Sequence, residues 1–445
     1  MEKEVKPGVH PPGYHLVIYW ARKWFGTSEN SLRMPSVVAG ILSIPMIYFL
    51  AKRIYGEDEG LEAAAFMAVL WLPVYYSQEA RSYSLQILFS LISVWCWLEW
   101  MGRLRKGDEW KVWSVAGYVL SAVVLSYLHF YGMYFVGLQG LVAILASVGS
   151  VRKMVNTLWV YIGVLVFHLP WSGVFFYQMR NNRHALSWIA KPGLNFFSRF
   201  WLFLFNNSVE LGLLMAFLIV LLLGGLVEKW RKRKTAIPWG ELAHNQSLWL
   251  FVWLAGPVSL AWLISQTVTP AMALRSFVFS APAAYILLAR SVMTLPYSKL
   301  FRWLIAGGIV GVCLFHLLFR MDYYSRVTKQ QYREATKYLV SVEKDYPDSL
   351  VIGWVWFAEH LEYYLERHGS EIKIDLLAGR VGDIRKTDEL IEDKQPDSVL
   401  LIRGHRVVEP EYLEFLDGKF GLVEHKELVG ADVWVFGNSG LNLEF

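Results

Sequence analysis

Two apolar runs, 61–74 and 85–100, flank the polar stretch Tyr75-Tyr76-Ser77-Gln78-Glu79-Ala80-Arg81-Ser82-Tyr83. Each run is long enough to form most of a membrane-spanning helix. The stretch therefore places a carboxylate, a guanidinium, an amide and three phenols where a membrane-spanning chain turns around. Ionisable groups in a membrane segment cost about 2.5–3.5 kcal/mol each on insertion scales, so they commonly serve a function. The alternative is a polar turn in which Glu79 and Arg81 only neutralise each other.

The composition predicts a polytopic membrane protein. Of 445 residues, 55% are hydrophobic and only 18% are charged, whereas soluble domains contain about 25% charged residues. We expect about ten spanning helices, in the apolar ranges 32–51, 61–76, 84–101, 112–130, 132–149, 155–175, 209–227, 247–266, 275–293 and 301–319. The two cysteines, Cys96 and Cys313, lie inside such runs and are expected to be packing residues.

Basic residues cluster in every second connection between these runs. The clusters are Lys52-Arg53, Arg103/Arg105/Lys106/Lys111, Arg152-Lys153, Lys229/Arg231/Lys232/Arg233/Lys234 and Arg290/Lys299/Arg302. The positive-inside rule makes these connections cytoplasmic. The other polar elements then share the outer face: the N-terminal segment, the stretch around Arg81, His129, the loop 177–207 and the turn 267–276. Their convergence predicts a cavity at the outer leaflet, which favours a functional role for Glu79 and Arg81.

The first 31 residues are predicted to lie on the outer face. Residues 14–25 combine Trp20, Trp24 and Phe25 with Arg22 and Lys23, which is typical of an amphipathic helix in the membrane interface. Because the register places this segment outside, we expect a spanning helix upstream of residue 1. Residues 32–322 are the predicted transmembrane domain.

Residues 323–445 are predicted to form an extracytoplasmic α/β domain. Helical patterns at 330–343, 358–368, 383–393 and 411–416 alternate with strand patterns at 349–356, 372–377, 398–402 and 433–436. Such alternation predicts a small, partly parallel sheet. No glycine-rich phosphate loop follows any of these strands, so no nucleotide is expected there.

A series of short motifs identifies a resemblance. The motifs, in chain order, are His10-Pro11-Pro12-Gly13-Tyr14, Leu32-Arg33-Met34-Pro35-Ser36, Tyr76-Ser77-Gln78-Glu79-Ala80-Arg81-Ser82-Tyr83, Tyr127-Leu128-His129-Phe130-Tyr131, Leu169-Pro170-Trp171 and Trp188-Ile189. This series resembles the membrane glycosyltransferases of the C-type fold, in the group of dolichyl-phosphate-mannose protein mannosyltransferases and lipid A aminoarabinose transferases. The resemblance implies transfer of a sugar from a polyprenyl-phosphate donor to a protein, lipid or glycan acceptor, at the outer face of the plasma or inner membrane.

The resemblance also implies the roles of individual residues. Cations near the outer interface would stabilise the departing lipid phosphate, and the candidates are His10, Arg33, Arg81 and Arg275. Supporting roles are expected for Gln78, Glu79, Tyr83, His129 and Trp188. Three of these candidates have a simpler alternative: His10 as a turn residue, His129 as a packing residue, and Trp188 as part of an aromatic belt. The Arg-Tyr pair of relatives is Arg275-Ser276 in this chain.

The catalytic base is the main departure from this family. Relatives carry an acidic pair before the His-Pro-Pro element, and it removes the acceptor proton. Only Glu2 and Glu4 precede His10 here, so the base is expected upstream of residue 1, or the chain is a non-catalytic subunit that binds lipid-linked sugars. A flippase is a third reading, but neither paired repeats nor mid-span charges support it. The sequence predicts no resident cofactor, no tightly bound metal and no nucleic-acid partner, and it leaves a weakly held divalent cation open. The triplet Asn206-Asn207-Ser208 matches a glycosylation acceptor by chance.

Overall fold

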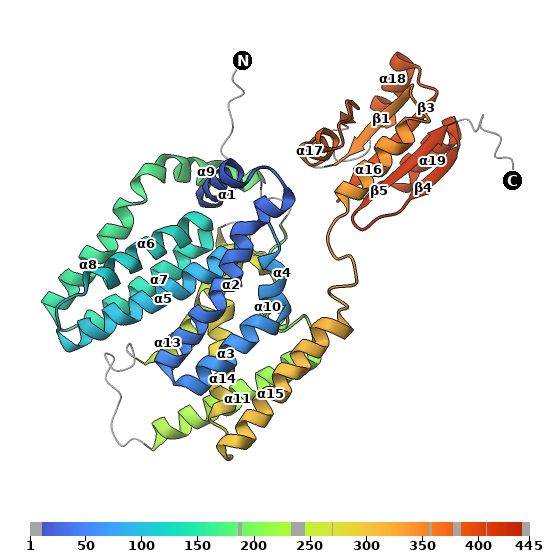
Figure 1. Ribbon diagram of the computed structural model, residues 1–445. Coiled ribbons are helices and arrows are strands. Elements are labelled where there is room, and N and C mark those ends of the chain that lie inside the picture. Colours follow the sequence, from blue (N-terminus) through green and yellow to red (C-terminus); the bar gives the residue numbers. More distant parts are fainter. Residues whose placement is uncertain are drawn as a thin grey trace. The chain divides into compact units, whose positions relative to one another are not determined.

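The computed structural model describes residues 11–185, 189–232, 245–268, 270–355, 358–376, 384–405 and 407–437. The chain forms two compact units, Met1–Arg320 and Met321–Phe445. The first unit is helical and the second contains a sheet (Figure 1).

The described part of the first unit consists of helices and the connections between them. Their bounds are α1 (Gly13–Phe25), α2 (Glu29–Ile54), α3 (Glu57–Val69), α4 (Trp71–Ser77), α5 (Tyr83–Lys106), α6 (Val112–Leu128), α7 (Phe130–Ser147), α8 (Val151–Val166), η1 (Leu169–Trp171), α9 (Ser172–Ala185), α10 (Asn195–Leu204), α11 (Val209–Arg231), α13 (Gln246–Thr267), η2 (Leu274–Ser280), α14 (Ala281–Met293), α15 (Lys299–Phe315) and η3 (His316–Arg320). Helices satisfy their own backbone hydrogen bonds, as a chain inside lipid must.

The predicted polytopic helical fold is confirmed. In the described part of the chain, eight helical segments are long and apolar enough to cross a membrane. The count becomes nine if α3 and α4, which meet at a bend of 57°, form one broken span. The remaining predicted span, 112–130, corresponds to α6, an apolar helix of 17 residues. The two cysteines are buried and free.

Ion pairs join helix ends at the basic end of the bundle. Arg53 at the end of α2 pairs with Glu99 of α5 (2.7 Å). Lys299 at the start of α15 pairs with Asp58 at the start of α3 (2.9 Å). These pairs gather several of the basic connections at one end, and the stretch around Arg81 follows α4 at the other end of the α3–α4 pair.

The segment 177–207 is more ordered than the predicted loop. It contains the last residues of α9 and all of α10. Helix α10 buries Phe196, Phe200, Phe203 and Leu204 on one face, a spacing that is typical of an amphipathic helix. The prediction of a loop was wrong because this helix is only 10 residues long and polar residues flank it.

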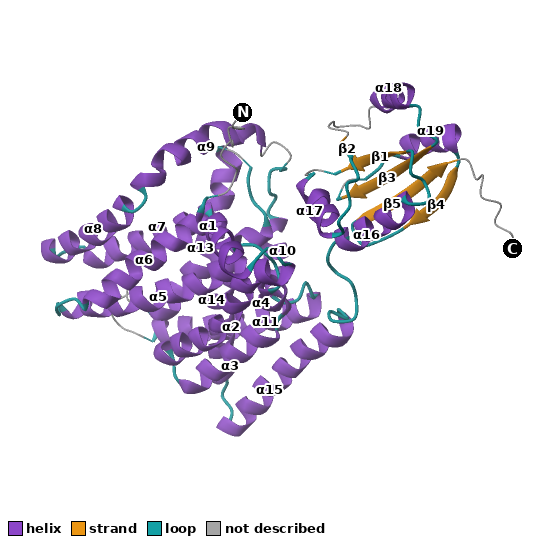
Figure 2. Ribbon diagram, turned by 45° about the horizontal axis from the view of Figure 1, so that its top comes forward, coloured by secondary structure: helices purple, strands orange, loops and turns teal. Residues whose placement is uncertain are grey.

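The second unit is a five-stranded mixed sheet with helices on both faces (Figure 2). The strands are β1 (Ser349–Trp354), β2 (Asp375–Leu376), β3 (Ser398–Gly404), β4 (Leu422–Lys426) and β5 (Ala431–Gly437), in the order β2-β1-β3-β5-β4. The first three strands of this order are parallel, and the last two pair antiparallel. Helices α16 (Tyr332–Glu343) and α17 (Glu359–Arg367) cover one face, and α18 (Ile384–Lys394) and α19 (Pro410–Phe420) cover the other. The α/β prediction is confirmed, but it omitted β4.

Candidate functional site

The turn after α4 has a compact backbone. The amide of Glu79 donates to the carbonyl of Tyr76 (3.3 Å), and the amide of Arg81 donates to the carbonyl of Glu79 (2.8 Å). Helix α5 begins two residues after Arg81. The turn therefore holds Glu79 and Arg81 close together without extending either helix.

Helix α2 contacts this turn through a hydrogen bond and a close backbone approach. The buried hydroxyl of Ser36 donates to the carbonyl of Arg81 (3.0 Å). One turn further along α2, a Cβ added to Gly40 would lie 2.6 Å from the Cβ of Ser77. Only glycine permits this close approach of α2 to the end of α4. The neighbouring helix therefore fixes the position of Arg81.

Two arginines act on one buried phenol. The charges of Arg275 and Arg81, and the opposite charge of Glu79, all act on the hydroxyl of Tyr83. Tyr83 is buried, whereas both arginines are exposed. The charge of Glu79 acts on the same phenol, so the alternative in which Glu79 and Arg81 neutralise each other stays open. Arg81 and Arg275 are 194 positions apart in the sequence. In the folded chain, the charges of both nevertheless act on Tyr83.

Helix α7 positions the segment that carries Arg275. The hydroxyl of Tyr131 donates to the carbonyl of Ala271 (2.9 Å), four residues before Arg275. His129 caps the start of α7, since its Nδ1 accepts from the amide of Tyr131 (3.3 Å). The imidazole also stacks on the ring of Tyr131. The structure therefore shows His129 as a buried cap that orders Tyr131, and its expected role in substrate binding stays a prediction.

Tyr14 is a member of the site that the sequence did not single out. Its hydroxyl is buried beside Ser36, and the charges of Arg81 and Glu79 act on it. Burial raises the pKa of Tyr14 to about 12, although Arg81 opposes this increase. The phenol therefore remains a hydrogen-bond donor at any physiological pH. The signal in the sequence is its position two residues after Pro12, at the start of the amphipathic helix.

Asn206 holds the bend between α3 and α4. Its Oδ1 accepts from the amide of Trp71 (2.8 Å), and its Nδ2 donates to the carbonyl of Cys313 in α15 (3.3 Å). The side chain is 1% exposed, and its φ of 57° lies in the left-handed region that asparagine tolerates. The bond to Trp71 replaces a helical bond at the bend and so aims α4 toward the site. Because Asn206 is buried and engaged, the glycosylation-like triplet is a structural element.

Aromatic rings line the approach to this bend. Tyr76 packs edge-on against Tyr83, with ring centroids 4.7 Å apart. Phe203 of α10 contacts both Trp71 and Tyr76. Such rings provide apolar surface with polar tips, which suits a ligand that has both a lipid and a polar part.

Of the remaining predicted site residues, Arg33 and Gln78 lie in the described part of the chain. Arg33 lies in the first turns of α2 and pairs with Glu29 (3.3 Å). Gln78 follows α4 as its C-terminal cap, and its amide donates to the carbonyl of Tyr75 (3.2 Å). His10 and Trp188 lie outside the described residues. Within the described part of the chain, no group of three or more His, Cys, Asp or Glu side chains is placed to hold a metal ion.

Comparisons with known proteins support the resemblance. Residues 9–176 match the profile of the family described as dolichyl-phosphate-mannose-protein mannosyltransferase. No curated protein matches the sequence. The apo structure of ArnT from Cupriavidus metallidurans matches with a TM-score of 0.55 at 14% identity, over 96% of this chain and 87% of that one. The chain has the fold of ArnT.

Two further structures share this fold. ArnT from the same organism, bound to undecaprenyl phosphate, matches with a TM-score of 0.52 at 12% identity, over 96% of this chain and 87% of that one. The Archaeoglobus fulgidus oligosaccharyltransferase, in complex with Zn and sulfate, matches with a TM-score of 0.54 at 13% identity, over 92% of this chain and 61% of that one. The ArnT fold and the matched profile confirm the predicted resemblance, and both include the part of the chain that carries Arg81.

Proposed function

We propose that this protein transfers a sugar from a polyprenyl-phosphate-linked donor to an acceptor at the outer face of the membrane. The observation that carries the proposal is that two exposed arginines from distant parts of the chain, Arg81 and Arg275, both act electrostatically on the buried Tyr83 hydroxyl. The matched profile belongs to a glycosyltransferase family. A fold alone does not establish an activity, so the proposal depends on this site.

The proposed reaction is a displacement at the anomeric carbon. The acceptor hydroxyl attacks that carbon, the bond from carbon to phosphate oxygen breaks, and the phosphate leaves with the electron pair. Negative charge therefore grows on the phosphate, where Arg81 and Arg275 would stabilise it, with Tyr83 and Tyr14 as neutral donors. The acceptor proton passes to a carboxylate. This carboxylate is expected to belong to the family's acidic pair. The charge of Glu79 acts on both of these tyrosines, so Glu79 would orient the acceptor or Arg81.

The proposed side of the membrane follows from the charge distribution. The connections rich in lysine and arginine would face the cytoplasm, so the site would open to the outer leaflet. By the same rule, the C-terminal domain would lie outside the cytoplasm. The proposed partners are the bilayer, the lipid-linked donor and an acceptor at this face.

A transfer assay tests the proposal. The protein would be reconstituted in liposomes with a panel of undecaprenyl-phosphate and dolichyl-phosphate sugars and a panel of protein, lipid and glycan acceptors, and release of the lipid phosphate would be measured. Arg81→Ala is expected to lower the rate by about 100-fold or more, as for other lost transition-state donors. Arg22→Ala removes an exposed arginine from α1 and should retain the rate. Binding of the donors without transfer of any of them would favour the non-catalytic binding subunit and refute the enzyme.

A further inference from the structure

A cavity lies between α5 and α13 and is not lined by the tyrosines of the candidate site. It has a volume of about 90 Å³, whereas a cavity of about 10–15 Å³ suffices for one water molecule. Trp97 of α5 and Trp249 of α13 contact each other with ring centroids 4.5 Å apart. These rings join the two helices at one wall of the cavity. Neither Tyr83 nor Arg275 lines it.

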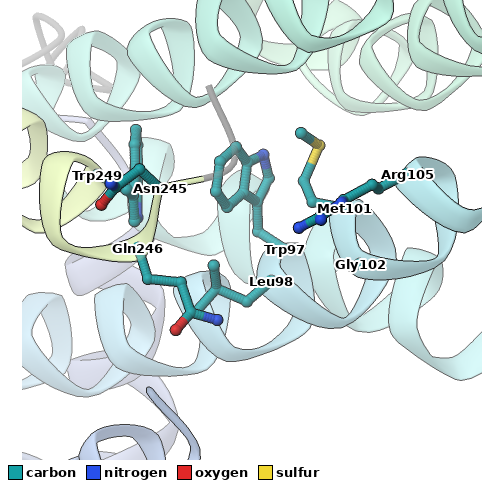
Figure 3. A pocket seen from close by; sticks show the side chains of 8 residues that line it. All are labelled: Trp97, Leu98, Met101, Gly102, Arg105, Asn245, Gln246 and Trp249. Carbon is teal, nitrogen blue, oxygen red and sulfur yellow. The ribbon is translucent and has the colours of Figure 1, made fainter. Parts of the chain in front are cut away.

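The polar groups around this cavity are predominantly hydrogen-bond donors. Figure 3 shows Arg105 extending from α5 toward Trp97, with Asn245 and Gln246 on the opposite side. Helix α13 begins at Gln246, so its first amides and positive dipole end are at this wall. The indole nitrogen of Trp249, a side chain that is 3% exposed, has no hydrogen-bond partner among the described residues. A cation, a helix start and a buried unused donor together favour an anion.

The remaining wall is apolar. Leu98 and Met101 line the cavity beside Gly102. A Cβ added to Gly102 would meet no atom within 4 Å, so the wall is open at this position. The ammonium group of Lys153 donates to the carbonyl of Arg105 (3.0 Å) and adds a second cation close to the cavity. A polar, cationic end next to an apolar strip suits a phosphate group with a hydrocarbon chain.

We propose that this cavity binds the phosphate headgroup of an anionic phospholipid. Arg105 would contact the phosphate, and the first acyl carbons would lie along Leu98 and Met101. The cavity lies at the end of α5 that carries the basic residues, and such segments attract anionic lipids. The proposal is independent of the transfer reaction.

Native mass spectrometry of the full-length protein in detergent tests the proposal. The protein would be mixed with phosphatidylglycerol or phosphatidylcholine, and the bound lipid counted. Wild type is expected to retain phosphatidylglycerol in preference. Arg105→Gln should lower this retention by about tenfold, because a charge-assisted hydrogen bond is lost. Lys106→Gln removes the same charge from the neighbouring position, which does not line the cavity, and should retain the lipid.

A second variant separates the cavity from the charge. Gly102→Leu keeps every charge and fills the open wall, so it should also lose the lipid, even if Arg105→Gln fails to fold. Inorganic phosphate in excess should not displace phosphatidylglycerol, because it has no chain to lie on Leu98 and Met101. Unchanged retention in both variants, or displacement by phosphate, would overturn the proposal.

Discussion

Replacing Asn206 gives a quantitative test of how the bend between α3 and α4 is held. Asn206→Gly keeps the left-handed backbone and removes both side-chain bonds, to Trp71 and to Cys313. A buried amide that loses its partner costs about 1–3 kcal/mol. Asn206→Ala adds about 1–2 kcal/mol, because alanine is strained at positive φ. The expected losses of unfolding free energy are therefore about 1–3 kcal/mol for glycine and about 2–5 kcal/mol for alanine.

The next residue supplies the matched control. Asn207 has a φ of 52° and an exposed side chain. Asn207→Gly should leave the stability unchanged, and Asn207→Ala should show the backbone strain alone. The assay is equilibrium unfolding in a mild detergent, followed by the circular dichroism of the helices. If Asn206→Gly proved as stable as Asn207→Gly, the two hydrogen bonds would not hold the bend and the reasoning would fail.

Two further predictions concern a close contact and a buried phenol. Gly40→Ala should lower the melting temperature, because overpacking against Ser77 costs about 1–3 kcal/mol; Gly102→Ala, where the added methyl group meets no neighbour, should not. Burial raises the pKa of Tyr412 to about 12, whereas an unfolded tyrosine titrates near 10. The folded state keeps the proton longer, so the stability of the C-terminal unit should fall as the pH rises from about 10 to 12. In Tyr412→Phe this decrease should be smaller, and absorbance at 295 nm should lose one late-titrating phenol; an unchanged titration would contradict the assignment.

Much of the fold was predictable because its signals are local. Runs of apolar residues require helices in a membrane, and the basic connections recur in alternate loops. Strand β4 was not predicted because all five of its residues are exposed, so it has no alternation of buried and exposed positions. Helix α10 was not predicted because it is short and rich in aromatic residues. Its ring contacts, such as those with Trp71 and Phe277, are distant in sequence.

The site was predictable only in part. The sequence indicated that Arg81 and Arg275 share one end of the bundle, and in the structure the charges of both act on Tyr83. The contribution of Asn206 was hidden, because its partner Trp71 lies 135 residues away. Tyr14 was not singled out, since nothing in the local sequence shows that its hydroxyl becomes buried beside Ser36. Long-range contacts of this kind are set by tertiary packing and leave no periodic signal.

The most direct test of the central claim is the affinity for undecaprenyl phosphate, measured in detergent by isothermal titration. If Arg81 and Arg275 hold the lipid phosphate, each single alanine variant should raise Kd by about tenfold or more, because a charge-assisted hydrogen bond is lost. Arg22→Ala should retain the wild-type Kd. Wild-type affinity in both Arg81→Ala and Arg275→Ala would contradict the account, because the two cations would then have no part in binding the carrier.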